Sequence, residues 1–184
     1  APVSGVGPVR SVTPDVTAQD TYFALAEVPN GTLLVKCLHG LTGGTLTCNQ
    51  VAPAFATSAG MTAVGMYRNH VYLAARGATG PATLTRLDVT TMEQAAVVNA
   101  CLDDTLSPRS ITTVGGVLAV LQSDLDGTPR GRIFGCGLGN GGDCDMTFPM
   151  WVVEPTVPAA GMAMVGMTAF VARGNTITYI TIRP

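Results

Sequence analysis

The sequence predicts an all-β fold made of one antiparallel unit that recurs about every 50 residues. The segment at residues 60–66 reads Gly-Met-Thr-Ala-Val-Gly-Met, and similar segments begin at residues 110 and 161. A period of this length indicates stacked or radially arranged units. The composition also favours short strands, because 22 glycines and 12 prolines in a chain that is 47% apolar break long helices without causing disorder.

Residues 1–20 are expected to form an extended arm with one edge strand near residues 9–12, because three prolines exclude a central strand. The first unit, residues 21–59, is expected to contain strands at 22–28, 33–38 and 45–51. Moving this unit 38 residues along the chain places residues 33–35 on residues 71–73. We therefore interpret it as a further copy of the repeat with a shorter tail.

Three more units follow, at residues 60–109, 110–160 and 161–184. Their expected strands are 61–64, 70–75, 83–89 and 95–101; 111–114, 117–122, 132–136 and 146–153; and 162–165, 168–172 and 176–182. Several of these strands are apolar at successive positions, which suits strands packed between neighbouring sheets. A β-sandwich also has short strands and regular turns, but it does not predict a repeat of about 50 residues.

The pattern Gly-Met-Thr-Ala-Val-Gly, followed by an apolar strand, a turn and Thr-Leu-Thr-Arg-Leu-Asp-Val, resembles the blades of a β-propeller. The resemblance implies one domain of four blades, similar in size to the hemopexin-like class, with a β-sandwich as the alternative. No kelch, WD or sialidase-type signature occurs, so no functional residue is carried over. The last unit lacks a fourth strand, and we expect a strand from residues 6–16 to pair beside residues 176–182 and complete it. The same pattern would also fit a part of a larger ring.

The cysteines predict two disulfides. If residues 42–43 form a two-residue hairpin turn, Cys37 and Cys48 lie opposite each other on paired strands, within disulfide range. Cys136 and Cys144 flank a glycine-rich run that is flexible enough to let them meet. We therefore predict the pairs Cys37–Cys48 and Cys136–Cys144, which leave out Cys101.

Several features favour a secreted or surface-exposed protein. The chain begins with the small residues expected after a cleaved leader, and Asn30 starts a glycosylation sequon in an expected turn.

The basic residues are scattered and the net charge is −2, which argues against a nucleic-acid partner. No apolar run approaches the ~20 residues of a membrane span. We expect the partners to be other protein chains or surface glycans.

The sequence favours a non-enzymatic protein-interaction or structural module, which could be one subunit of a larger assembly. His39 and His70 occupy non-equivalent strand positions, and no nucleophile motif accompanies them. The three glutamates lie far apart in the sequence. The alternative is a carbohydrate-active or other hydrolase, for which the fold would have to bring two carboxylates together at the channel mouth.

One turn departs from the short, nearly uncharged turns of the other units. Residues 123–130 read Ser-Asp-Leu-Asp-Gly-Thr-Pro-Arg, and loops carry binding more often than the scaffold beneath them. We expect Asp124, Asp126 and Arg130 to contact a partner. Asp124 and Asp126 also resemble the start of a calcium loop, so calcium is the one ion considered there. No other metal and no cofactor is expected.

Overall fold

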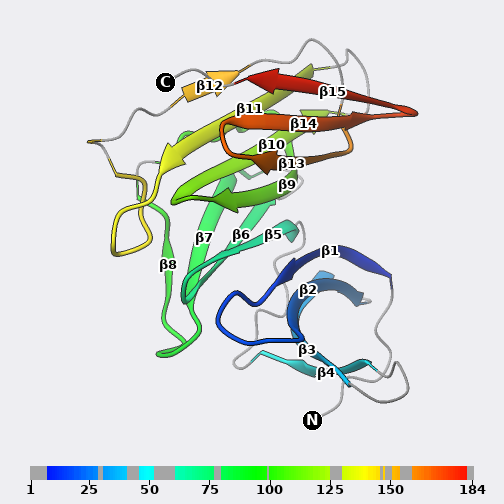
Figure 1. Ribbon diagram of the computed structural model, residues 1–184, viewed down its shortest axis with the longest axis vertical. Helices are drawn as coiled ribbons and strands as arrows, with labels where there is room; N and C mark the ends of the chain where they lie inside the picture. Colours follow the sequence, from blue (N-terminus) through cyan, green and yellow to red (C-terminus); the bar gives the residue numbers. More distant parts are fainter. Residues whose placement is uncertain are drawn as a thin grey trace.

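Figure 1 shows the computed structural model of the chain. All regular structure in the part that it describes is β-strand, arranged in four antiparallel sheets that follow one another in a ring. This is the arrangement of a four-bladed β-propeller, so the predicted fold class is confirmed. The described residues are 8–28, 31–40, 46–51, 61–76, 80–98, 100–124, 130–145, 147, 151–153 and 159–181.

The strands of each blade pair in chain order. The first blade contains β1 (Val9–Pro14), β2 (Thr21–Val28), β3 (Gly31–His39) and β4 (Leu46–Gln50). The second contains β5 (Met61–Tyr67), β6 (His70–Arg76), β7 (Ala82–Asp88) and β8 (Gln94–Ala96). The third contains β9 (Ser107–Val114), β10 (Val117–Asp124), β11 (Arg130–Gly137) and β12 (Trp151–Val153). The fourth contains β13 (Gly161–Val165), β14 (Thr168–Arg173) and β15 (Thr176–Thr181).

Consecutive blades pack face to face, and their first strands lie next to each other, β1 by β5, β5 by β9 and β9 by β13. We call the space between two consecutive blades a seam. One hydrophobic cluster occupies each of the three seams. Both faces of the middle strands therefore carry apolar side chains, because each face covers a neighbouring sheet. This burial explains the apolar runs in the sequence.

Each blade has a forward face. In the first three blades this face packs against the next blade along the chain, and in the fourth blade it is the corresponding face. The third residue of the second strand lies on it in every blade: Phe23, Tyr72, Ala119 and Phe170. Tyr72 and Ala119 are fully buried, but Phe170 is 40% exposed. Nearby on β15, Ile177 and Tyr179 are more than 70% exposed. The forward face of the fourth blade is thus an uncovered apolar surface.

The prediction of ring closure by the N-terminal segment is wrong. The expected edge strand near residues 9–12 is present as β1, but it pairs with β2 as the first strand of the first blade and not with β15. In the described residues β15 pairs with β14 alone. The physical reason is register: Val12 and Thr13 pair directly with Ala24 and Phe23, and this pairing gives the first blade its four strands.

Two sequence alignments also need correction. The offset of 38 residues placed β3 on β6, but β3 is a third strand and β6 a second strand, so that interpretation was one strand out of step. The corresponding second strands, β2 and β6, begin 49 residues apart, at Thr21 and His70. The alignment of residues 60–66 with the similar segment that begins at residue 110 was also wrong, by three residues. The turn that precedes β6 begins at Arg68, 47 residues before its counterpart Gly115, because β5 continues three residues beyond the echoed valine.

Both predicted disulfides are present. Cys37 and Cys48 are directly paired across β3 and β4, and Cys136 is bonded to Cys144 just after β11. Cys101 is exposed and takes part in neither bond. Each disulfide lies within a single blade. Disulfides of this kind are typical of proteins that mature in an oxidising environment.

Candidate binding site

Seams widen away from their first strands, because adjacent blades touch there and diverge toward their outer strands. The space that opens must be filled by side chains, by a loop or by something else. The two seams on either side of the second blade solve this differently.

A loop fills the seam between the second and third blades. Residues 138–145 follow β11, and the Cys136–Cys144 disulfide closes the base of this loop. Tyr72 Oη donates a hydrogen bond to the carbonyl oxygen of Gly142 at 3.0 Å. Arg86 donates to the carbonyl oxygen of Gly141 and, at 3.2 Å, to Asp143 Oδ2. The loop is therefore held on the forward face of the second blade by one buried hydroxyl and one guanidinium.

Glycine is required at the centre of this loop. Gly142 has a φ of +80°, a conformation that residues with a Cβ rarely adopt. A Cβ built on it would lie 3.0 Å from Tyr72 Oη and 3.1 Å from the ring of His70. The close approach of backbone to blade thus depends on the missing side chain.

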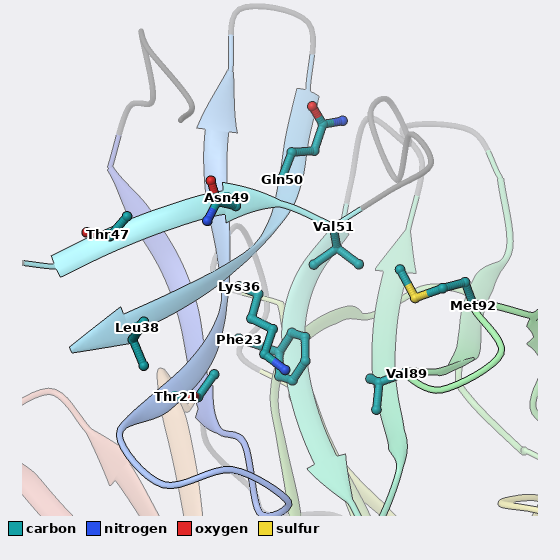
Figure 2. A pocket seen from close by; sticks show the side chains of 10 residues that line it. All are labelled: Thr21, Phe23, Lys36, Leu38, Thr47, Asn49, Gln50, Val51, Val89 and Met92. Atoms are coloured by element: carbon teal, nitrogen blue, oxygen red, sulfur yellow. The ribbon is translucent and has the colours of Figure 1, made fainter. Parts of the chain in front are cut away.

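The seam between the first and second blades holds a cavity instead. The connection from β7 to β8 is residues 89–93, whereas the connection from β11 to β12 is residues 138–150. The shorter connection leaves a cavity of about 570 Å³ between the outer strands of the first blade and residues 89–92 (Figure 2). This volume is within the usual range for sites that bind small ligands or short segments of chain.

The cavity combines an apolar floor with a polar wall. Val51 and Val89 supply apolar surface from the two blades, above the buried ring of Phe23. Asn49, directly opposite Lys36 on β4, brings a side-chain amide, whereas the side chain of Gln50 points to the other face of its sheet (Figure 2). Amides and hydroxyls can donate to and accept from backbone or sugar groups without a net charge. Such a lining can form hydrogen bonds to a bound ligand.

Met92 lines the cavity from a strained backbone position. Its φ is +63°, which is uncommon for a residue with a long side chain. Hydrogen bonds to Asp88 fix the backbone of this turn. Met92 N donates to the carbonyl oxygen of Asp88 at 2.8 Å. Asp88 Oδ1 accepts from the backbone N–H groups of Thr90 and Thr91. These backbone hydrogen bonds lower the pKa of Asp88. A position of this kind costs on the order of 1–3 kcal/mol and is found most often at functional sites.

Lys36 is the single ionisable side chain among the described lining residues. Its Nζ lies 2.8 Å from Asp15 Oδ2 and 5.1 Å from the centre of the Phe23 ring. Burial disfavours the Asp15 carboxylate, but hydrogen bonds from Lys36 and Thr17 outweigh burial and lower its pKa. The Asp15 side chain is fully buried, whereas that of Lys36 is 44% exposed. The ammonium is therefore anchored by a buried partner and still open to the cavity.

The filled seam carries the other perturbed groups of this region. Burial lowers the pKa of His70 despite the nearby Asp88, whose Oδ2 lies 3.7 Å from His70 Nε2. Burial also raises the pKa of Tyr72, so its hydroxyl keeps its proton and remains a donor to Gly142. Tyr72 therefore helps to hold the loop of the third blade on the second blade.

The predicted loop lies elsewhere. Asp124 and Arg130 are opposite each other at the end of the β10–β11 hairpin, and neither lines the cavity. Arg130 is exposed, and its Nη2 lies 3.5 Å from Thr105 Oγ1. Asp126 and the sequon residue Asn30 lie outside the described residues. The contact, calcium and glycosylation predictions there stay predictions.

Sequence reasoning missed the cavity. The signal available was the difference in length between the two connections that follow a third strand, five residues against 13. A second signal was Lys36, the one lysine of the chain, placed between apolar neighbours on a strand. Neither could be interpreted before the blade order was known.

Comparisons with known proteins do not identify a family. No protein-family model matches the chain, and no curated protein is similar to it at a significant level. In the part that the structure describes, no group of three or more His, Cys, Asp or Glu side chains is placed to hold a metal ion. The same residues include no helix with the length and apolar character that a membrane span requires.

Proposed function

We propose that the protein is a secreted or surface-exposed, non-enzymatic interaction module, and that it binds a partner macromolecule in the cavity between its first and second blades. The observation that carries the proposal is the cavity itself, in a seam whose counterpart is filled by a loop. Its lining has hydrogen-bonding groups around an apolar floor, as recognition sites do. The two disulfides support an oxidising, extracellular location.

Binding is favoured over hydrolysis because the described residues that line the cavity include no acid and base pair. A glycosidase needs two carboxyl groups that face a common substrate. The carboxylate that pairs with Lys36, that of Asp15, is buried and is engaged by the ammonium. Lys36 serves as a fixed positive charge for recognition, and the wall around it is neutral.

A screen with methyl-labelled methionine tests this proposal. Glycans and peptides are added to the protein, and the methyl signals of Met92, in the cavity, and Met164, buried in the seam between the third and fourth blades, are compared. We expect at least one ligand to shift the Met92 signal and leave Met164 unchanged. Asn49→Trp, which fills the cavity from its exposed wall, should abolish the shift. Binding that survives Asn49→Trp, or recovery of a chemically converted ligand, would overturn the proposal.

We further propose that the chain belongs to an assembly that covers the forward face of the fourth blade. Exposed Phe170, Ile177 and Tyr179 support this, because soluble proteins rarely leave neighbouring large apolar residues uncovered. The native mass in solution is the test. A mass equal to one chain, in the protein purified without denaturant, would refute it.

A further inference from the structure

We infer that the cavity binds a tight, glycine-containing turn of another polypeptide that presents a carboxylate to Lys36. This inference rests on the proposed function and narrows it to one class of ligand. The protein itself contains the template, since the loop at residues 138–145 makes such an interaction in the next seam.

Lys36 and Arg86 occupy the same place in their blades. Each lies on the third strand, directly opposite the third residue of the second strand, and each points to the forward face. Lys36 is paired with Phe23, and Arg86 is paired with Tyr72. Both blades therefore present a cation beside an aromatic ring where their seam begins to widen.

In the filled seam, this pair of residues binds a turn. Arg86 contacts the Asp143 carboxylate and the Gly141 carbonyl oxygen, while Tyr72 donates to the carbonyl oxygen of Gly142. Asp143 Oδ1 also accepts from the backbone N–H of Val98 at 3.0 Å. The recognised chemistry is thus two carbonyl oxygens and one carboxylate, on a backbone with no Cβ at its centre.

In the open seam, the same chemistry is available to an outside ligand. An ammonium has three donors, and Asp15 takes one of them, so donors of Lys36 remain for an incoming carboxylate. Val89 and Met92 offer apolar surface in this cavity without a hydroxyl such as that of Tyr72, which suits the Cα of a glycine. Asn49, directly opposite Lys36 on β4, then supplies the hydrogen bond to a backbone group that Tyr72 supplies in the filled seam.

The loop at residues 138–145 of a second copy does not supply this turn, so we assign the turn to a different protein. The matching loop of this chain is closed by the Cys136–Cys144 disulfide and is already hydrogen-bonded to its own second blade. A second copy would have to release that loop before it could offer it. A partner with an exposed acidic turn meets no such cost.

A cyclic peptide provides the probe. The nonapeptide Cys-Gly-Leu-Gly-Asn-Gly-Gly-Asp-Cys, which has the sequence of residues 136–144 and is closed by its disulfide, is titrated into the intact protein. The matched control peptide carries Asn in place of Asp143. We expect the acidic peptide to shift the Met92 methyl signal and to bind at least about tenfold more tightly than the control, because hydrogen bonds to a charged group are the stronger ones.

Three variants of the protein locate the interaction. Lys36→Arg, which copies the second blade, should retain or improve binding of the acidic peptide. Lys36→Met combined with Asp15→Asn removes the charge without leaving a buried carboxylate unpaired, and it should reduce the acidic peptide to the affinity of the control. Asn49→Trp leaves the ion pair intact and should abolish binding of both peptides.

The outcomes separate this inference from the proposed function. Equal affinity for the two peptides, or no binding of the acidic peptide, would overturn the inference. If a neutral oligosaccharide shifts Met92 while neither peptide does, the protein is still a binding module and the ligand class assigned here is wrong. If no ligand of any class shifts Met92, both proposals fail together.

Discussion

Gly65→Ala tests how closely the second and third blades pack. Gly65 is buried on β5, and a Cβ built on it would lie 2.5 Å from Ile111 Cγ2 and 3.0 Å from Ile111 Cβ. The added methyl group therefore cannot enter the seam without moving β9. No positive φ is involved, so the expected effect is steric alone.

The magnitude follows from a matched control. Gly161 is also on the first strand of a blade, and a Cβ built on it meets no atom within 4 Å. Both Gly→Ala changes gain about 0.4–1 kcal/mol by restricting the unfolded chain. Overpacking costs about 1–3 kcal/mol, and it applies to Gly65→Ala alone. The difference between the two variants should therefore be about 1–3 kcal/mol, or a difference in Tm of roughly 2–12 °C for a domain of this size.

Thermal and urea unfolding of the two single variants measure this difference. A double-mutant cycle with Ile111→Ala then identifies the partner, because removing the isoleucine side chain should restore much of the loss and give a coupling energy of about 1 kcal/mol or more. Equal Tm values for Gly65→Ala and Gly161→Ala would refute the reasoning. An additive cycle would show that Ile111 is not the neighbour that matters.

Four further predictions concern the filled seam and the cavity. Gly142→Ala should lower Tm and expose the loop to limited proteolysis, because it adds both positive-φ strain and a clash; unchanged cleavage would argue against docking. The pKa of His70 is lowered by burial, so the unfolded state binds more protons and stability should fall as the pH drops from about 7.5 to 5.5; His70→Gln should flatten this slope in urea titrations at each pH. Cys136→Ala with Cys144→Ala should cost about 2–3 kcal/mol by the loop-closure estimate, and peptide mapping without reductant should recover the disulfide in the parent protein. Met92→Gly should leave Tm unchanged or raise it, because the strain at this position is relieved, while ligand affinity in the cavity falls.

The sequence was sufficient for the fold class because the repeat and the composition act at the level of whole strands. It was not sufficient for strand order. Two β-strands of similar length and apolarity, such as β3 and β6, look alike in sequence, and only pairing shows that one is a third strand and the other a second strand. The error at the first blade therefore followed from comparing single strands without their partners.

The disulfides were predictable because each is local. Cys37 and Cys48 depend on one hairpin, and Cys136 and Cys144 depend on one short loop. The cavity was not predictable, because it depends on how Lys36 and Met92, which belong to different blades, are placed relative to each other. Contacts across a seam are set by the packing angle of two sheets, and the sequence pattern of either sheet does not determine that angle.

The seams also determine how the molecule can come apart. Each hydrophobic cluster that joins two blades spans consecutive blades alone, and both disulfides of the described residues stay inside one blade. The chain then approximates a one-dimensional array, in which the free energy of unfolding is a sum of blade terms and nearest-neighbour terms. Mutations in the seam between the first and second blades share no contacting residue with mutations in the seam between the third and fourth blades, so their effects on the free energy of unfolding should add. The effects of two mutations within one seam should not add. The second and third blades each have two neighbours, so they would open last, and the fourth blade, with one covered face, can separate while the others remain folded.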